Sequence, residues 1–161
     1  MNYTAKRTAY RHFELYDDRD TLIGILDYPS WYRAREATVT AGNKTYDLNA
    51  VGFFRSSIEV TLGGATVATI RYNWRTSFEI VMENGTVYRF KRTSIWGSSF
   101  GLYDNYDHQL TELITKFQLL KFSFSYTFRT DDNYAECNSP LLLALMLYTL
   151  NDMRNRHAAV V

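Results

Sequence analysis

The chain has 161 residues, a length typical of one domain with a single hydrophobic core. Its 18 lysines and arginines nearly balance its 17 aspartates and glutamates, which disfavours a protein built mainly to coat nucleic acid. A single cysteine, Cys137, excludes an intramolecular disulfide, and the basic N-terminus lacks the apolar run of a secretory signal. We therefore expect one domain over residues 1–161, located in the cytoplasm.

Turn signals recur roughly every 8 to 12 residues, between runs rich in aromatic and β-branched side chains, a pattern typical of antiparallel hairpins. We assign residues 1–11 to an N-terminal extension. After it we predict five hairpins and a last strand. The hairpins pair residues 13–16 with 22–26, 37–40 with 45–48, 57–62 with 66–72, 78–82 with 87–91 and 99–103 with 110–114, and the last strand covers 122–128.

The fourth hairpin offers two registers. A two-residue Asn-Gly turn would place Ile80 opposite Arg89, which is a poor pairing. A three-residue loop that ends with Gly85 in the left-handed conformation instead places Ile80 opposite Tyr88. The other face then pairs Glu79 with Arg89. We predict this second register because it gives one apolar and one polar face and a favourable cross-strand charge pair.

Residues 140–150, with the sequence PLLLALMLYTL, are apolar on every side of a helix. Such a helix must be surrounded by protein or lipid. Its apolar run of about 11 residues is well short of the roughly 20 that span a bilayer, which favours a core helix over a membrane anchor. We predict a helix over 140–157. The side chains that we expect in the core are Leu141, Leu142, Leu143, Leu145, Met146, Leu147 and Leu150.

The predicted strands can surround this helix by closing into a barrel. There are more strands than an open sheet usually holds, and closing the sheet into a barrel removes its exposed edges. Ser139 is the expected N-cap, while Arg154 and Arg156 complement the helix dipole near the C-terminus. We predict a mainly β fold: a closed antiparallel β-barrel of about twelve strands around a central apolar C-terminal α-helix, with an interior that holds no ligand.

The meander and the following segment NSPLLLALMLYTL at residues 138–150 resemble the tubby-like superfamily, which includes the tubby C-terminal domain, the plant LURP-one-related proteins and the phospholipid scramblases. The similarity covers roughly residues 13–156, with the hairpin DDRDTLIG at 17–24 as weaker support. It implies a barrel around a central helix, a non-enzymatic function and, from the tubby domain, phosphoinositide binding by basic residues on the barrel exterior. No tubby signature motif is present, so lipid binding is one implied function among several.

The sequence shows no enzymatic motif. His12, His108 and His157 are far apart, none belongs to a His-Glu-x-x-His pattern, and Cys137 has no nearby base. We expect no catalytic residue, no metal and no cofactor.

Two acidic turns, at residues 17–20 and 104–107, carry oxygen ligands of the kind that calcium prefers. They lack an EF-hand pattern, and Asp and Asn are common in hairpin turns because they bond to the backbone. We expect that structural role. Trp31, Trp74 and Trp96 fall near strand ends, where we expect them to plug the barrel.

The strongest binding candidate is a basic and aromatic surface on neighbouring hairpins, formed by Arg71, Arg75, Arg89, Lys91 and Arg92. Alternation points Arg89 and Lys91 outward, and Arg92 lies at the strand end, where it would join Arg71 or Arg75. Such a cluster suits a phosphate or a lipid headgroup. The alternative is an ordinary solvated face on which Arg89 pairs with a cross-strand glutamate.

We expect a non-enzymatic binding or scaffold module, cytoplasmic and peripheral to the membrane, whose partner is an anionic membrane lipid or another protein. We expect no nucleic acid partner and no transmembrane segment. Three alternatives stay open: a protein–protein interaction domain, a lipocalin-like carrier of a small ligand, and a hydrolase.

Overall fold

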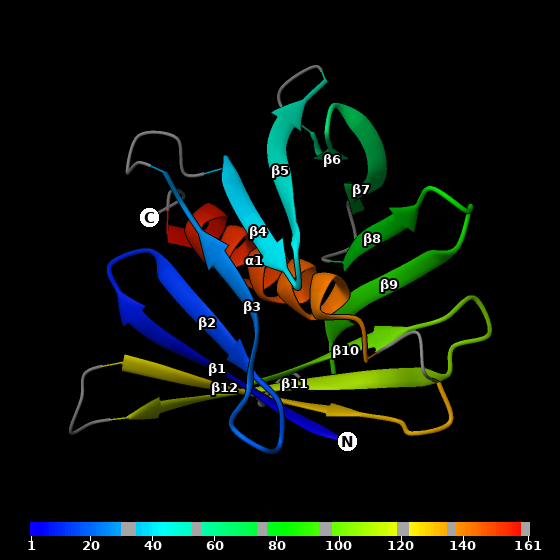
Figure 1. Ribbon diagram of the computed structural model, residues 1–161. Helices are drawn as coiled ribbons and strands as arrows, with labels where there is room; N and C mark the ends of the chain where they lie inside the picture. Colours follow the sequence, from blue (N-terminus) through cyan, green and yellow to red (C-terminus); the bar gives the residue numbers. More distant parts are fainter. Residues whose placement is uncertain are drawn as a thin grey trace.

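The computed structural model describes residues 1–29, 35–52, 56–73, 77–93, 98–118, 123–134 and 138–158. These residues form a closed barrel of twelve antiparallel strands around one helix, as the sequence predicts (Figure 1). The strands are β1 (Asn2–Ala9), β2 (His12–Tyr16), β3 (Leu22–Asp27), β4 (Ala37–Ala41), β5 (Lys44–Val51), β6 (Ser57–Leu62), β7 (Ala65–Asn73), β8 (Ser77–Met82), β9 (Val87–Arg92), β10 (Ser99–Tyr103), β11 (Gln109–Gln118) and β12 (Ser123–Thr130). The helix is α1 (Pro140–Ala158).

Each strand pairs with the next one along the chain, and β1 closes the barrel by pairing with both β2 and β12. The assignment of residues 1–11 to an extension is therefore wrong. Tyr3 and Ala5 face the core from β1, but the next position on that face, Arg7, lies at the open end of the barrel and is charged. Two apolar positions are too few to show the alternation of a strand.

The five predicted hairpins are all present, and the fourth has the predicted register. Ile80 lies opposite Tyr88, and Glu79 lies opposite Arg89. Gly85 has a φ of 83°, which is the left-handed conformation that the three-residue loop requires. A residue with a Cβ would be strained at this position.

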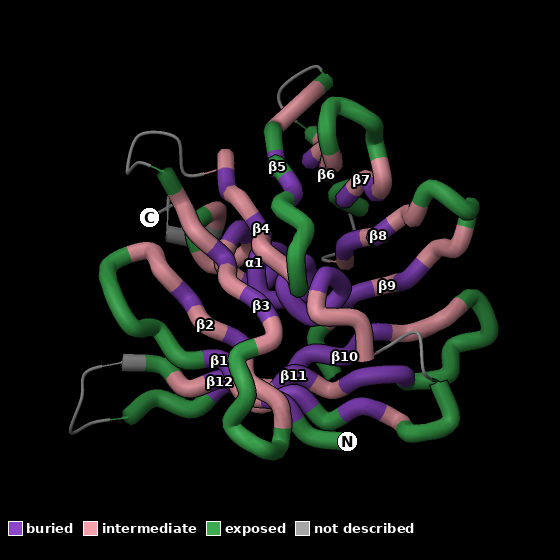
Figure 2. Tube along the Cα trace, viewed as in Figure 1, coloured by how far each residue is buried: buried purple, intermediate pink, exposed green. Residues whose placement is uncertain are grey.

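The helix fills the middle of the barrel. All ten residues from 141 to 150 are at most 8% exposed, including every leucine and the methionine predicted for the core. Figure 2 shows this part of α1 in purple among the inward positions of the strands, with green confined mainly to turns and outer faces. The helix begins after Ser139, whose carbonyl oxygen accepts a hydrogen bond of 3.1 Å from the Leu143 N–H. Among the described residues, no helix combines the length and hydropathy that crossing a bilayer requires.

Two tyrosines join the helix to β3 and the segment before β4. The rings of Tyr28 and Tyr148 stack with centroids 5.9 Å apart. The Tyr148 hydroxyl donates to the Arg35 carbonyl oxygen at 2.8 Å, and the Asn151 amide donates to the Tyr28 hydroxyl at 3.2 Å. Burial raises the pKa of both phenols above the ordinary value, so the two rings stay neutral in the core.

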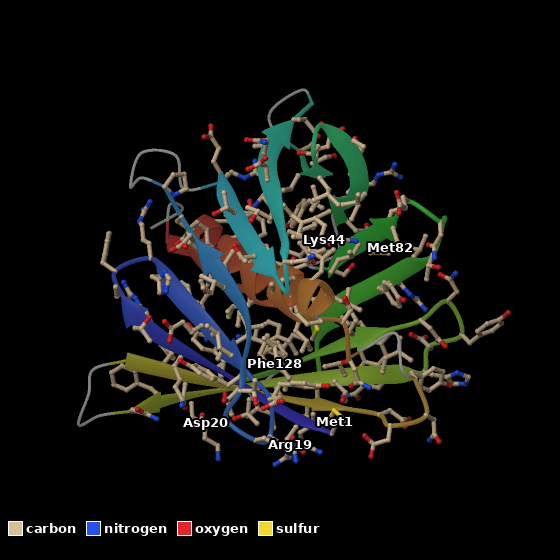
Figure 3. The ribbon with its side chains drawn as sticks, in the orientation of Figure 1. Met1, Arg19, Asp20, Lys44, Met82 and Phe128 are labelled. Atoms are coloured by element: carbon tan, nitrogen blue, oxygen red, sulfur yellow. The ribbon has the colours of Figure 1, made fainter. Side chains whose placement is uncertain are left out.

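The two ends of the barrel carry opposite charge. In an up-and-down meander, alternate turns meet at the same end. The turns around the start of α1 carry eight acidic residues, against the cations Arg19 and Lys44: Asp17, Asp18, Asp20, Glu83, Asp104, Asp107, Asp131 and Asp132. Figure 3 labels two residues of this end, Arg19 and Asp20, in the β2–β3 turn. The opposite end, where α1 finishes, carries seven cations, against the acidic Glu36 and Asp152: Arg7, Arg11, Arg35, Arg92, Lys116, Arg154 and Arg156.

Candidate functional site

The predicted basic surface on the barrel wall is largely neutralised. Arg89 and Lys91 point outward from β9, as predicted, and each lies 3.2 Å from the same carboxylate oxygen of Asp107. Arg89 also donates to the Asp104 carbonyl oxygen at 3.0 Å. Arg89 thus forms its ion pair with Asp107, in the turn between β10 and β11. The predicted ion pair with Glu79 is not formed.

Arg92 lies on the other face of the sheet. Alternation along β9 places it with the buried Tyr88 and Phe90, but at the strand end, where the barrel opens. Its guanidinium lies 5.6 Å from the centre of the Phe100 ring. Arg71 belongs to the outward set of β7, so the expected convergence of Arg71 with Arg92 is not formed. Arg75 lies outside the described residues.

Four arginines surround the C-terminal end of α1: Arg7 on β1, Arg11 after β1, Arg92 on β9 and Arg154 on the helix. We refer to them as the basic mouth. Within the described residues, Arg7, Arg92 and Arg154 form no ion pair with a carboxylate. Their positive charge is therefore available to an anion from outside the protein.

Arg154 is held in place by neutral groups. Its guanidinium donates to the Thr115 hydroxyl at 3.0 Å and to the Tyr126 hydroxyl at 3.4 Å, and it stacks 4.4 Å from the Phe124 ring centre. The Thr115 hydroxyl in turn donates to the Ser98 carbonyl oxygen at 3.0 Å. These contacts fix the position of the guanidinium and leave its charge uncompensated.

Arg154 separates two cavities at this end of the barrel. The larger one, about 480 Å³, is called the mouth cavity below. It is lined by Arg92, Ser98, Phe100, Thr115, Leu150, Met153 and Arg154. The smaller one, about 240 Å³, is lined by Arg7, Tyr10, Arg11, Phe13, Tyr28, Phe124, Tyr126, Asn151, Arg154 and Asn155.

Exposed aromatic rings accompany the basic mouth. Tyr10 is 75% exposed and lies under both Arg7 and Arg11, at 5.3 and 5.4 Å from the guanidinium carbons. Phe117 and Phe124 are 49% and 41% exposed and contact each other, with ring centroids 5.2 Å apart, where β11 and β12 extend past the core. The end of α1 thus combines cations with large apolar groups.

The other two arginines near the end of α1 have a structural role. Asp152 is 4% exposed and accepts hydrogen bonds from Arg35 at 3.2 Å and from Arg156 at 2.9 Å. Arg156 also packs over the Tyr72 ring at 4.9 Å. This network anchors the last turns of the helix to β7 and to the segment before β4.

The acidic turns have the expected structural role. One carboxylate oxygen of Asp17 accepts the backbone N–H groups of Arg19 and Thr21 at 2.9 and 2.8 Å. Asp104 does the same in the turn between β10 and β11, where one carboxylate oxygen accepts the N–H groups of the residues two and four positions later. Across the described residues, no group of three or more His, Cys, Asp or Glu side chains is placed to hold a metal ion.

His12 takes part in a small polar cluster on the barrel wall. Its two ring nitrogens contact Asp27 at 2.5 Å and Glu14 at 3.3 Å. The hydrogen bond with Asp27 raises the pKa of His12 above its ordinary value. Because both nitrogens face carboxylates, this arrangement favours a charged, structural imidazolium. Cys137 and the three tryptophans lie outside the described residues, as does the side chain of His157.

Arg7, Arg11 and Arg154 were not predicted as site residues from the sequence. A signal was present, because alternate connections of a meander lie at the same end of a barrel. The connections at 17–20, 83–85, 104–108 and 131–134 are acidic, while residues that lie near the other connections and the helix end are mostly basic. Summing charge over alternate turns would have found the basic mouth.

The fold is shared with a plant protein. A search of solved structures finds the X-ray structure of a protein from Arabidopsis thaliana, with a TM-score of 0.61 and 17% sequence identity. The match covers 95% of this chain and 90% of that one. At this identity the similarity establishes the fold alone. No family model and no curated protein matches the sequence.

Proposed function

We propose that the protein is a non-enzymatic binding module with a tubby-like barrel, and that it recognises the anionic headgroup of a membrane phospholipid through the basic mouth. One observation carries this proposal: Arg92 and Arg154 line the same cavity, and within the described residues neither pairs with a carboxylate. A guanidinium is the side chain best suited to a phosphate, because its planar fork donates two parallel hydrogen bonds.

The exposed rings support a membrane as the source of this headgroup. Aromatic side chains favour the interface between water and lipid, where an apolar body and a polar neighbour are both accommodated. Phe124 lies against Arg154 and contacts Phe117, and Tyr10 lies beside Arg7. The anionic lipids of the cytoplasmic leaflet attract such a surface, with about 1 kcal/mol from each cation near the membrane.

The proposal moves the lipid site away from the barrel wall. Arg89 and Lys91 already contact Asp107, so recruiting them would require breaking two ion pairs. Arg92 and Arg154 require no such exchange. The basic mouth is therefore a better anion site than the surface predicted from the sequence.

Co-sedimentation with vesicles tests this function. We expect binding to phosphatidylcholine vesicles that contain phosphatidylserine, a steep loss of binding as salt rises, and little binding to phosphatidylcholine alone. Combining Arg92→Gln with Arg154→Gln should weaken binding about thirty-fold, since each cation contributes about 1 kcal/mol.

The matched control combines Arg19→Gln with Lys44→Gln. It removes the same charge from the opposite end of the barrel and should leave binding nearly unchanged. Equal loss of binding in both double variants would show that net charge, and not the basic mouth, governs attachment.

A further inference from the structure

The mouth cavity has a second property that headgroup recognition does not use: its inner wall is apolar. Leu150 is fully buried, Phe100 is 5% exposed, and Met153 completes this wall. The cavity thus extends from the exposed Arg92 at the rim to the helix in the core. Its volume of about 480 Å³ falls in the range of roughly 300 to 1,000 Å³ typical of small-molecule sites.

Charge at the rim restricts what this cavity accepts. Arg92 and Arg154 are cationic, and the remaining polar groups in its lining, Ser98 and Thr115, are neutral. Among the described residues that line the cavity there is no carboxylate. An occupant must therefore place an anion at the rim and an apolar group against the inner wall.

We infer that the mouth cavity binds a single-chain anionic amphiphile, with its carboxylate or phosphate between Arg92 and Arg154 and its hydrocarbon chain against Phe100, Leu150 and Met153. The inference rests on the proposed function for the role of the two arginines, and it adds the chain as a second recognised part. A free fatty acid and a membrane lysophospholipid share this chemistry.

Two cavities at the other end of the barrel, where α1 begins, lack this combination. A cavity of about 360 Å³ at the start of α1 is lined mainly by apolar residues of β3 and by Pro140, and none of its described lining residues is charged. Another, beside the N-terminus, places Asp17 and Asp18 next to Arg19. The first offers nothing to an anion, and the second repels one.

Burial of the chain supplies most of the expected affinity. Each methylene removed from water contributes about 0.8 kcal/mol, so lengthening a ligand by two methylenes should tighten binding about fifteen-fold until the cavity is full. Short carboxylates such as acetate should bind weakly. A headgroup site without an apolar pocket would show no dependence on chain length.

Isothermal titration with dodecanoate in vesicle-free buffer tests the inference. We expect one molecule bound per protein, weaker binding of octanoate, and no detectable binding of methyl dodecanoate, which lacks the charge. Ser98→Trp should fill the cavity from its rim and weaken dodecanoate binding at least ten-fold, because the Ser98 side chain is exposed and its substitution leaves the carbonyl bond to Thr115 in place.

Asn49→Trp is the matched control, because it adds the same ring to an exposed position on the outer face of β5 and should leave dodecanoate binding unchanged. Ser98→Leu provides a smaller filling residue if the tryptophan variant fails to fold. Unchanged dodecanoate affinity in a folded Ser98 variant would overturn the inference.

The two proposals fail separately in this design. Vesicle binding without dodecanoate binding would overturn the chain site alone. Dodecanoate binding without preference for anionic vesicles would overturn membrane recognition and leave a carrier of free amphiphiles. A lysophosphatidylserine titration in both formats then distinguishes ligand taken from solution from ligand taken from the membrane.

Discussion

The two ends of the barrel use their charges differently. At the end where α1 begins, the carboxylate of Asp17 bonds its own turn, and the carboxylate of Asp107 neutralises Arg89 and Lys91. At the end where α1 finishes, Arg92 and Arg154 contact neutral or aromatic groups. The comparison shows that these charges have a structural role at one end, whereas those of Arg92 and Arg154 remain available for a ligand at the other.

At the acidic end, the Asp17 carboxylate accepts hydrogen bonds from the backbone of its own turn. The Thr21 N–H bond lowers the pKa of Asp17 below its ordinary value, so this carboxylate is ionised and engaged at neutral pH. The Asx-type turn is a local structure, formed by residues a few positions apart. The basic mouth instead draws on β1, β9 and α1, which are distant in sequence.

The largest expected effect comes from breaking the core that both ends share. Leu145 is fully buried in α1, so Leu145→Asp should prevent folding, because nothing offsets the desolvation of the new charge. Circular dichroism and size-exclusion chromatography will detect the loss. The exposed Asn155→Asp is the control on the same helix and should fold normally. A monodisperse Leu145→Asp protein with an unchanged spectrum would refute enclosure of the helix.

The next largest effect is the loss of stability on removing the buried carboxylate of Asp152, compared with removing the exposed carboxylate of Asp107. Asp152→Ala leaves Arg35 and Arg156 without their buried partner and should cost about 3 to 5 kcal/mol in the free energy of unfolding. Asp107→Ala removes an exposed partner at the other end and should cost less than about 1 kcal/mol. Urea denaturation measures both, and similar values would contradict a structural role for Asp152.

Exposed aromatic rings give a smaller, functional effect. Phe117→Ser should weaken binding to anionic vesicles about ten-fold, since the ring would no longer enter the lipid interface. Tyr106→Ser removes an exposed ring from the acidic end and should leave vesicle binding unchanged. If both rings contribute equally, the basic mouth is not the side that faces the membrane.

The smallest expected effect is a pH dependence from His12. Its pKa is raised by the hydrogen bond with Asp27, so protonation favours the folded state. This stabilisation is present below the ordinary pKa of 6.5 and is lost as the pH rises through the raised value. His12→Gln should therefore narrow the difference in urea midpoint between about pH 6 and about pH 8, and an unchanged difference would contradict the stabilising role of the charged imidazole.

The hairpins and the helix were predictable because their signals are local. Alternation and turn residues define each hairpin, as the confirmed pairing of Ile80 with Tyr88 shows. The helix segment is apolar all round, which requires enclosure wherever it lies in the chain. β1 escaped prediction because its inner face carries two apolar residues and then Arg7.

The site was less predictable because it depends on long-range geometry. Lys91 and Arg92 are neighbours in sequence, but strand alternation sends them to opposite faces, one to Asp107 and the other to the mouth cavity. Arg154 joins Arg92 only because the helix ends inside the same opening of the barrel. The surface predicted from sequence proximity therefore combined cations that form ion pairs with a cation that forms none among the described residues.

These two neighbours provide the most direct test of the account. Arg92→Gln and Lys91→Gln remove the same charge one residue apart, and only the first removes a cation of the basic mouth. Each should be measured by co-sedimentation with phosphatidylcholine vesicles that contain phosphatidylserine. We predict about five-fold weaker binding for Arg92→Gln and little change for Lys91→Gln, whose loss leaves Asp107 paired with Arg89. The reverse order, or equal losses, would contradict the claim that the basic mouth binds the headgroup.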